Sequence, residues 1–449
     1  MRLAEALGVR AGDVVALVGA GGKTAALYRL AEELGAGHSL VATTTTHMLP
    51  PPAPWPLILA PHPADGREAA LRAIAACGRA FVASSRLSDG RLVGIPPGEV
   101  PSLAALAEVT LVEADGARGR WVKAPAAHEP AMPAAASLVV PVVGLQALGR
   151  SIDSPCVHRP EHLAHLLGVS PSESLTPALL ARLLQHERGG LCAAPASARI
   201  VPLLNQADGA AERCAGREIA AAVLGRCNRV RRVAIAALQY SEACECWQPT
   251  AAIVLAAGAS RRFGRLKQAE PWRGSTLLQR AVAAALSSLA SHVVVVLGCE
   301  AERLRASLPP EGGRLRVIIN SSWAEGRASS VRAGLGAIRD CVQAVVFLNA
   351  DQPLLTGREV DALLVRYAET GVPLVGPRCA GVLRSPVLFA RPLFAELQAL
   401  TGEQGGRIIC VRHAGEAAVI DMADHLPFTD IDTPADLTRL DSTVGEDMT

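Results

Sequence analysis

A cluster of basic residues follows an apolar run in the second half of the chain. The stretch LAAGASRRFGRLK, Leu255 to Lys267, places three arginines and one lysine directly after the run AAIVLA. Gly258 lets backbone N–H groups approach a triphosphate, because no side chain blocks the contact. Arg262 can hold phosphate oxygens with two parallel hydrogen bonds, and Lys267 can follow a leaving pyrophosphate as a point charge. We predict a nucleoside triphosphate here; a solvated basic turn is the alternative.

Carboxylates that follow other apolar runs predict a metal site. The segment AVVFLNADQPLL leads into Asp351, and the carboxyl end of a central strand is where α/β enzymes hold ligands. The segment FTDIDTPADL adds Asp430 and Asp432, followed by Thr433 as a candidate helix cap. Magnesium prefers one or two carboxylates together with phosphate oxygens. We therefore expect Asp351 to bind Mg²⁺; for Asp430 and Asp432, helix capping alone is the alternative to a functional role.

The first half of the chain begins with a second candidate phosphate site. The segment DVVALVGAGGKTAALYRLAEEL predicts a strand, a glycine-rich turn and an amphipathic helix. Free N–H groups at a helix start, next to a lysine, are suited to phosphate. Leu17 stands where the full Walker pattern has its first glycine, so the loop is a shortened variant. The expected nucleotide-binding residues are Gly19, Gly21, Gly22, Lys23 and Thr24.

Three further segments of the first half support a nucleotide site. The segment VTLVEAD places Glu113 and Asp115 at a strand end, and the run of threonines at 43–46 offers hydroxyl groups for magnesium or water. The segment VPLLNQAD carries Asn205 and Asp208 at the spacing of the GTPase base-recognition motif, so Asp208 is a candidate for reading a guanine edge. The alternatives are a helix cap for NQAD and an ordinary β-rich strand end for the threonines.

Alternating β-branched runs and Ala/Leu-rich stretches must position these residues. The alternation predicts an α/β fold, with mostly parallel sheets covered by helices on both faces. We expect an N-terminal P-loop-like three-layer α/β domain over residues 1–240 and a C-terminal Rossmann-like domain over residues 250–449. Residues 241–249 are expected to form a polar, irregular linker. The expected strands lie at 13–19, 39–46, 79–85, 109–115, 137–144, 199–208, 231–238, 250–258, 292–298, 315–320, 344–351 and 373–377.

Composition excludes several classes of function. The net charge of +2 and the 3% of aromatic residues do not favour a nucleic-acid platform. The eleven cysteines show no repeated CxxC spacing, so we expect free thiols, including the CxC pair Cys244 and Cys246. The first residues lack the apolar core of a signal peptide, and the two longest uncharged stretches contain prolines or central polar residues. We expect a cytoplasmic protein with no transmembrane segment.

The order of motifs in the second half is similar to that of one enzyme family. The motifs are LAAGxSRRxGxxK, WRGSTLLQ, NSSWAEGRASSVRAGL, LNADQPLL and DIDTPADL. Over residues 250–440 they resemble the molybdenum cofactor cytidylyltransferases among the MobA-like nucleotidyl transferases. The resemblance implies transfer of CMP from CTP to the phosphate of molybdopterin, with release of pyrophosphate.

The resemblance also implies roles for individual residues. Arg262, Lys267 and Asp351 would be catalytic, and Asp432 would complete the Mg²⁺ site at Asp351. Ala257, which gives LAAG in place of LAGG, would favour cytidine over guanine. Trp323 belongs to the acceptor motif, with core packing as its alternative role. The implied nucleotide-binding residues are Leu255, Ala256, Ala257, Gly258 and Gly264, and the implied acceptor-binding residues are Asn320, Trp323, Ser329 and Ser330.

Two departures from the family pattern concern the acceptor. Arg384 and Ser385 stand where these families often show glycine and histidine before PVLF. Residues 402–407 read GEQGGR where the families show GDxGAR. Both changes leave nucleotidyl transfer in place and fall in the half expected to bind the acceptor.

The first half resembles another family. The segments GAGGKT, TTTTHM, VEADGARGRWVKAPAAHEP, VHRPEHL and LLNQAD, in that order, are similar to the selenium-dependent hydroxylase accessory proteins called YqeC, over residues 10–240. His47, His128, His158, Arg118 and Lys123 fall inside these segments. The resemblance implies an accessory domain of hydroxylase maturation. The glycine-rich turn and the further segments above predict its nucleotide, and both ATP and GTP stay open.

Together these observations predict an enzyme of molybdenum hydroxylase maturation. Its expected ligands are CTP, Mg²⁺ and a molybdopterin-type acceptor, and an apo molybdenum hydroxylase is the expected partner. Two alternatives stay open: a nucleotidyltransferase acting on a sugar or polyol phosphate, and a nucleotide-gated cofactor chaperone without catalysis.

Overall fold

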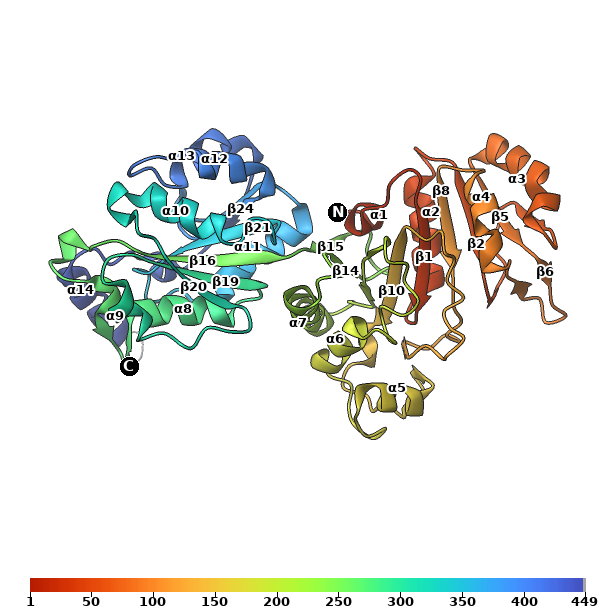
Figure 1. Cartoon of the computed structure of the whole chain (residues 1–449), viewed down its shortest axis with the longest axis horizontal. Coiled ribbons are helices and arrows are strands. Elements are labelled where there is room, and N and C mark those ends of the chain that lie inside the picture. Colours follow the sequence, from red (N-terminus) through yellow and green to blue (C-terminus); the bar gives the residue numbers. More distant parts are fainter. Residues whose placement is uncertain (447–449) are drawn as a thin grey trace. The chain divides into compact units, whose positions relative to one another are not determined.

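A computed structural model describes residues 1–446 and divides the chain into two compact units, Met1–Trp247 and Gln248–Thr449. Each unit contains one large, mostly parallel sheet with helices on both of its faces (Figure 1). The predicted α/β fold class is therefore confirmed. Within the described residues, every helix is too short or too polar to span a lipid bilayer.

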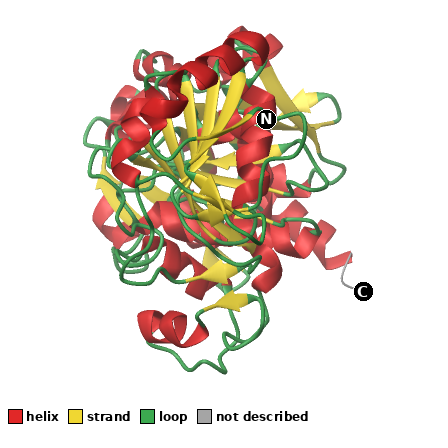
Figure 2. Cartoon of the chain, turned by 90° about the vertical axis from the view of Figure 1, so that its right-hand side faces the viewer, coloured by secondary structure: helices red, strands yellow, loops and turns green. Residues whose placement is uncertain are grey.

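The N-terminal unit is built on a ten-stranded sheet. Its order is β15-β14-β13-β10-β1-β8-β2-β5-β4, with β12 paired to β10, and Figure 2 shows these strands side by side with helices around them. All pairs are parallel except β14 with β15. The strands are β1 (Val14–Gly19), β2 (Leu40–Thr44), β4 (Leu57–Leu59), β5 (Arg79–Ala83), β8 (Val109–Glu113), β10 (Leu138–Gly144), β12 (Arg199–Ile200), β13 (Leu203–Asn205), β14 (Val233–Ala236) and β15 (Cys244–Trp247).

Alternate residues of these strands contact different helices. Ala234 and Ala236 of β14 belong to the same core as Leu27 and Leu30 of α2, whereas Ile235 packs against Gly216 of α7. This period of two is what a sheet buried on both faces requires. The helices are α1 (Leu3–Leu7), α2 (Lys23–Leu34), α3 (Pro63–Cys77), α4 (Val100–Ala104), α5 (Pro160–Leu167), α6 (Pro177–Gln185) and α7 (Ala210–Arg226). Short strands β3 (His47–Met48), β6 (Ser85–Arg86), β7 (Leu92–Val93), β9 (Val122–Lys123) and β11 (Val157–His158) form two small sheets.

The prediction of an irregular segment at 241–249 is wrong, because it contains β15. All four residues of β15 are buried, and the strand pairs antiparallel with β14 at the edge of the sheet. The segment reads as polar in the sequence because Glu245 is charged. Its carboxylate accepts hydrogen bonds from the guanidinium of Arg217 at 2.6 to 3.2 Å and from the indole N–H of Trp247 at 2.8 Å, so it can be buried within the strand.

The C-terminal unit is built on an eight-stranded sheet of order β20-β19-β16-β21-β24-β22-β23, with β25 paired to β22. Strands β20, β19, β16 and β21 are parallel, and β24 runs antiparallel to its two neighbours. The strands are β16 (Thr250–Ala256), β19 (His292–Leu297), β20 (Leu315–Ile319), β21 (Ala344–Asn349), β22 (Leu374–Cys379), β23 (Val382–Leu383), β24 (Val387–Ala390) and β25 (Ala417–Asp421), and β17 (Pro271–Trp272) pairs with β18 (Ser275–Thr276).

Helices cover both faces of this sheet. Gly334 of α10 allows that helix to lie against Ile253 and Val296, because a Cβ at position 334 would stand 2.7 Å from the side chain of Ile253. Helices α8 and α11 pack against each other and against strands of the same sheet. The helices are α8 (Leu277–Ser287), α9 (Ala301–Arg305), α10 (Arg327–Gly336), α11 (Gly357–Thr370), α12 (Phe394–Gln398), α13 (Arg407–Arg412) and α14 (Pro434–Glu446).

The strand order creates a ligand position at β16. This strand pairs with β19 on one side and with β21 on the other, so the chain leaves it toward one neighbour and returns on the opposite side. In open α/β sheets, ligands bind beyond the carboxyl ends of the strands at such a switch point. The loops that follow β16 and β21 are the basic loop and the Asp351 loop.

Candidate functional site

The basic loop after β16 is held in shape by a buried glutamine. The Gln268 side-chain amide donates to the carbonyls of Gly258 at 2.8 Å and Ala256 at 3.4 Å, and Ser260 Oγ donates to Gln268 Oε1 at 2.8 Å. Ser260 and Gly264 both have a left-handed backbone, with φ of 53° and 77°. The loop therefore returns toward the sheet and brings its basic side chains back over the strand ends.

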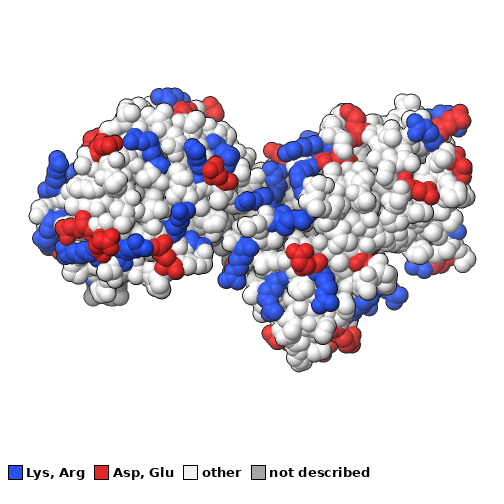
Figure 3. All heavy atoms as spheres, in the orientation of Figure 1, with Lys and Arg blue, Asp and Glu red and all other residues white. Residues whose placement is uncertain are grey.

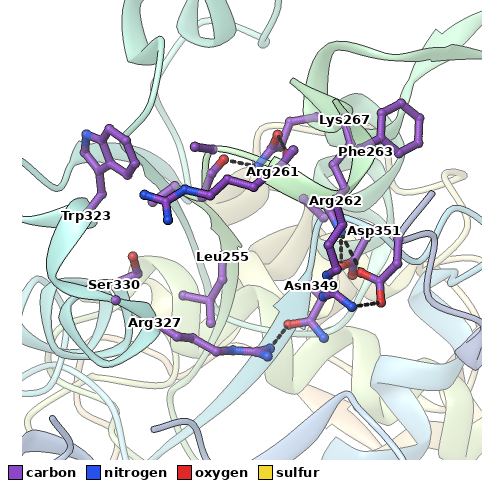
Figure 4. A pocket seen from close by; sticks show the side chains of 18 of the residues that line it. Leu255, Arg261, Arg262, Phe263, Lys267, Trp323, Arg327, Ser330, Asn349 and Asp351 are labelled. Atoms are coloured by element: carbon purple, nitrogen blue, oxygen red, sulfur yellow. Dashed lines mark hydrogen bonds and ion pairs between the residues drawn. The ribbon is translucent and has the colours of Figure 1, made fainter. Parts of the chain in front are cut away.

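Cations from this loop contact carboxylates from two other segments (Figure 4). Lys267 Nζ lies 2.6 Å from Asp351 Oδ2 and 3.4 Å from Asp432 Oδ1, and it also donates to the carbonyl of Ile431 at 3.0 Å. Arg262 Nη1 donates to Asp432 Oδ2 at 2.8 Å. The four charged residues predicted to share one ligand thus lie together, although Arg262 and Asp351 are 89 positions apart in the sequence.

These residues border a cavity of about 410 Å³. Nine of the predicted site residues line it: Leu255, Ala257, Gly258, Arg262, Lys267, Trp323, Ser330, Asp351 and Asp432. Among the other lining residues, Arg261, Gln268, Arg327 and Asn349 had not been predicted from the sequence, and Glu403 belongs to the segment 402–407 that departs from the family pattern. Arg327 and Asn349 lie within motifs noted in the sequence, and Arg327 Nη2 donates to Asn349 Oδ1 at 2.5 Å.

Four predicted residues lie outside the cavity lining. Ala256 is buried within β16, and Gly264 closes the turn of the basic loop. Asn320 is buried and donates to Ser329 Oγ at 2.9 Å and to Ser330 Oγ at 3.1 Å. Ser329 in turn donates to the carbonyl of Gly326 at 2.8 Å. Asn320 and Ser329 therefore fix the start of α10, and only Ser330 of this trio also reaches the cavity.

Asp351 and Asp432 are suited to a divalent cation that takes most of its ligands from phosphate and water. Asp351 Oδ1 is buried and has no hydrogen-bond partner, while Asp351 Oδ2 is bound by the ammonium of Lys267. Among residues 1–446, no group of three or more His, Cys, Asp or Glu side chains is arranged to hold a metal. Magnesium commonly binds one or two carboxylates and completes its shell with phosphate oxygens and water. Asp351 and Asp432 match that donor set.

A second cavity of about 660 Å³ shares Leu255, Arg327, Asn349 and Glu403 with the first. One wall is apolar and contains Phe347 and Phe389, whose rings pack edge to face 6.0 Å apart. Four positions that depart from the family pattern also line this cavity, namely Arg384, Ser385, Glu403 and Gly406, together with the matching Gly405 and Arg407. The altered residues therefore surround the cavity next to the basic loop.

In the N-terminal unit, β1 runs through the glycine-rich turn into α2. Gly19, Gly21 and Gly22 have φ of 89°, 86° and 128°. A Cβ at position 21 would stand 2.3 Å from the backbone nitrogen of Gly144, so only glycine fits there. Lys23 is buried, donates to the carbonyl of Gly19 at 2.6 Å and lies 3.0 Å from Asp115 Oδ1.

The other predicted residues of this unit surround the turn to different degrees. Thr24 Oγ1 donates to Glu113 Oε2 at 2.8 Å, and burial raises the pKa of Glu113 against the opposing effect of Lys23. Asn205 Nδ2 donates to the carbonyl of Gly21 at 2.7 Å. Asp208 lies against Gln146, whose amide donates to it at 2.7 Å, so the structure brings Asn205 but not Asp208 to the turn.

The threonine run mainly bonds to neighbouring backbone. Thr43 Oγ1 donates to the carbonyl of Val82 at 2.8 Å, Thr44 Oγ1 to that of Glu113 at 2.9 Å and Thr45 Oγ1 to that of Ala131 at 2.7 Å. These hydroxyl groups therefore tie β2 to adjacent segments. The eleven cysteines are all free thiols, as predicted.

An acidic residue near the turn provides a pH-dependent test of stability. Burial alone would raise the pKa of Glu129, but hydrogen bonds from Arg159 and Lys123 outweigh it and lower the pKa to about 2. A lowered carboxylate pKa contributes stability above the unfolded-state pKa, and this contribution is lost as the pH falls toward 2. Because Glu129 is partly solvated, we expect Glu129→Gln to cost the N-terminal unit about 2 kcal/mol at pH 6.

The measurement is urea unfolding at pH 6 and at pH 3, followed by hydrogen exchange in peptides from β8 and β10. The difference between wild type and Glu129→Gln should shrink at the lower pH. Exposed Glu68, which pairs with Arg72 on the surface of α3, provides the control Glu68→Gln. An equal effect of both substitutions would contradict the assignment.

The fold and the site of the C-terminal unit define a nucleotidyltransferase, in which a basic loop and strand-end carboxylates share one cavity on a mostly parallel sheet. Family models match two parts of the chain, "YqeC protein" over residues 15–161 and "MobA-like NTP transferase domain" over residues 252–417. The chain belongs to the YqeC family in its N-terminal part and to the MobA-like NTP transferases in its C-terminal part, which confirms both predicted resemblances.

Three curated relatives match individual parts. The uncharacterized protein YqeC of Escherichia coli (strain K12) is 36% identical over 197 residues, which cover 43% of this chain and 75% of that protein. The nicotine blue oxidoreductase of Paenarthrobacter nicotinovorans is 32% identical over 197 residues, 42% of this chain and 94% of that protein. The molybdenum cofactor cytidylyltransferase of E. coli (strain K12) is 26% identical over 187 residues, 41% of this chain and 91% of that protein. Because the relatives carry different activity names, the substrate assignment depends on the site itself.

Proposed function

We propose that this enzyme transfers CMP from CTP to the phosphate of a molybdopterin-type acceptor and releases pyrophosphate. The observation that carries the proposal is the shared cavity in which Lys267 and Arg262 face Asp351 and Asp432, next to a second, larger cavity. The similarity to the E. coli cytidylyltransferase supports the choice of acceptor and nucleotide.

The first cavity is suited to the nucleotide. Gly258 leaves open space above its backbone, since a Cβ built there would meet nothing within 4 Å. The triphosphate would lie against this backbone, with Arg262 and Lys267 neutralising the β- and γ-phosphates. Asp351 and Asp432 would hold Mg²⁺, which when bound would supply further neutralisation of the phosphate charge.

The second cavity is suited to an acceptor that combines a flat ring system with an anionic group. The rings of Phe347 and Phe389 provide an apolar wall, and Arg384 and Arg407 provide cations. Planar guanidinium groups bind phosphate with two parallel hydrogen bonds. Arg327 lines both cavities, so it can orient the acceptor phosphate toward the nucleotide.

The chemistry requires no covalent enzyme intermediate. An oxygen of the acceptor phosphate attacks the α-phosphorus of CTP in line, the new P–O bond forms, and the bond from the α-phosphorus to the β-phosphate oxygen breaks. Pyrophosphate leaves with the electron pair of that bond. The enzyme contributes positioning and charge stabilisation, and Lys267 is placed to stabilise the leaving group.

The direct test measures turnover of the full chain with radiolabelled CTP or GTP and with molybdopterin, a sugar phosphate or a polyol phosphate as acceptor. We expect labelled CMP to appear on molybdopterin only. Pyrophosphate release that requires a sugar phosphate and ignores molybdopterin would overturn the proposal. An oxidoreductase assay with nicotine blue, suggested by the name of one relative, serves as the negative control.

Ala257 provides a test of nucleotide choice. This buried residue lines the cavity, and its carbonyl accepts from Cys299 N–H at 3.0 Å, close to Gly298 and Trp323. We expect Ala257→Gly to widen the base position and to lower the CTP-to-GTP ratio of kcat/KM about tenfold. The neighbouring Ala256→Gly is the control, because Ala256 lies outside the cavity lining. A ratio that changes equally in both variants would show that Ala257 does not select the base.

We also propose that the N-terminal unit binds ATP or GTP and acts in the maturation of a molybdenum hydroxylase in a reducing compartment such as the cytoplasm. The glycine-rich turn, Lys23 and Thr24 support the nucleotide site, and eleven free thiols support the compartment. Joining the two units would raise the effective concentration of the product of one site near the other.

Lys23→Ala separates the two sites. We expect binding of radiolabelled ATP or GTP to fall at least about tenfold, because the phosphate loses its charged partner. Cytidylyl transfer should stay within about twofold, because Lys23 contacts Gly19 and Asp115 within its own unit. Loss of both activities would show that the two units do not work independently.

A further inference from the structure

The chain contains only three lysines, Lys23, Lys123 and Lys267, among its 44 basic residues. The other 41 of these residues are arginine. On the visible face of the C-terminal unit, basic and acidic side chains lie interspersed (Figure 3). Arginine therefore supplies all the remaining positive charge among the Lys and Arg residues of the chain. Lys23 and Lys267 each belong to one of the two proposed phosphate sites. Neither proposal includes the third lysine, Lys123.

Lys123 lies at the same carboxylate as Lys23. Lys123 Nζ is 3.1 Å from Asp115 Oδ2, and Lys23 Nζ is 3.0 Å from Asp115 Oδ1. Both lysine side chains are at most 4% exposed, and Asp115 is fully buried. Lys123 comes from β9, far in sequence from the glycine-rich turn, so the fold itself brings the two ammonium groups together.

The groups around the Asp115 carboxylate are of the kinds that also bind phosphate. The backbone N–H of Gly19 donates to Asp115 Oδ2 at 2.9 Å, and two ammonium groups complete the contacts. A glycine-rich turn before a helix and converging lysines are the groups that proteins use to bind phosphate. A cavity of about 20 Å³ lined by Gly19, Asp115 and Lys123 lies beside them, and it leaves no room for a phosphate while Asp115 stays in place.

We infer that Lys123 is a second phosphate-binding lysine and that Asp115 occupies the position of the terminal phosphate of a nucleotide. The inference deepens the proposed nucleotide function of the N-terminal unit and rests on it. When the Asp115 side chain rotates away, Lys123 keeps Glu129 as a partner but Lys23 loses its ion pair, and a terminal phosphate supplies the compensating anion. Asp115 thereby acts as an internal competitor that keeps the site closed until a nucleotide enters.

Two other contacts keep Lys123 in place during this exchange. Its ammonium donates to the carbonyl of Gly116 at 2.7 Å and to Glu129 Oε2 at 2.9 Å, and Arg159 pairs with the same carboxylate. Release from Asp115 therefore does not free Lys123 to leave the turn. The ammonium stays beside the glycine-rich turn, with one donor direction available for phosphate.

Acyl-phosphate derivatives of ATP and GTP test the inference on the wild-type chain, because they acylate lysine amines next to the terminal phosphate. Mass spectrometry then has three lysine sites to read, and a CTP derivative acting on Lys267 is the positive control. We expect both Lys23 and Lys123 to be acylated, with protection by unmodified nucleotide. Labelling of Lys23 alone would overturn the role of Lys123 and leave the nucleotide function intact. Labelling of neither, while Lys267 reacts, would overturn both.

Asp115→Asn tests the internal competition. In a Lys267→Ala background, which silences the second site, ATP or GTP should bind at least about tenfold more tightly to Asp115→Asn than to the parent, because the competing charge is gone. Lys123→Gln in the same background should bind at least about tenfold more weakly, and Lys123→Arg should recover part of the loss. Unchanged or weaker binding by a folded Asp115→Asn would overturn the competitor role. If that variant does not fold, the labelling of the wild-type chain decides.

Discussion

Asp351→Ala should abolish nucleotidyl transfer, with a fall in kcat of about 1,000-fold or more, equivalent to about 4 kcal/mol of transition-state stabilisation. The substitution removes a carboxylate whose Oδ1 is free for a cation and whose Oδ2 orients Lys267. Both contributions act where charge develops on the phosphates. Single-turnover transfer from radiolabelled CTP measures the effect, with circular dichroism to confirm folding.

Asp340 provides the matched control. It precedes β21, whereas Asp351 follows it, so the two acidic residues lie beyond opposite ends of the same strand. Asp340 is 82% exposed and pairs only loosely with Arg339. Asp340→Ala should keep full activity. A second measurement supplies preformed cofactor and follows activation of the hydroxylase. If the activation by Asp351→Ala is reduced by less than about tenfold, the chain would be a carrier and not an enzyme.

Lys267→Ala should lower kcat by about 100- to 1,000-fold. The ammonium of Lys267 contacts Asp351, Asp432 and the carbonyl of Ile431. Its removal takes away the cation proposed to face the leaving pyrophosphate and leaves two carboxylates to repel each other. Lys267→Arg should recover only part of the rate, because a planar guanidinium does not fit three acceptors arranged around a compact ammonium.

Arg265 is the control for Lys267 in the same loop. Its guanidinium pairs with Glu270 at 2.5 and 2.7 Å, and it does not line the cavity. Arg265→Ala should change kcat by less than about threefold, since exposed ion pairs contribute little. Equal losses in the two variants would indicate that overall loop charge, and not the position of Lys267, supports the reaction.

The fold class followed from local patterns. The runs at 250–258, 292–298 and 344–351 are buried β-branched segments, and they form β16, β19 and β21 because parallel strands with helices on both faces must be apolar throughout. The segment at 244–247 failed this criterion because Glu245 is charged. Its partners Arg217 and Trp247 make burial possible, and the pairing with Arg217 is a long-range contact that no local pattern contains.

Only part of the candidate site could be predicted from local sequence patterns. Arg262, Lys267 and Asp351 stood out because they are charged residues in loops that follow apolar strands, where α/β proteins bind ligands. Gln268 and Arg327 did not, because a glutamine that supports a loop and an arginine at a helix start resemble surface residues in sequence. Asn320 and Ser329 appeared in the acceptor motif, yet they hydrogen-bond one another beneath the cavity.

The sequence by itself determined which residue types end each strand, since the order of apolar runs, glycines and charges is a local property of the chain. It thereby determined the α/β class and the two phosphate-type loops. Only the tertiary structure decided which strand ends meet, because pairing between β16 and β21 or between β1 and β8 joins segments about 90 residues apart. The convergence of Lys23 and Lys123 on Asp115 is of this second kind: strand order places the two ammonium groups at one carboxylate, and their separation along the chain carries no trace of it.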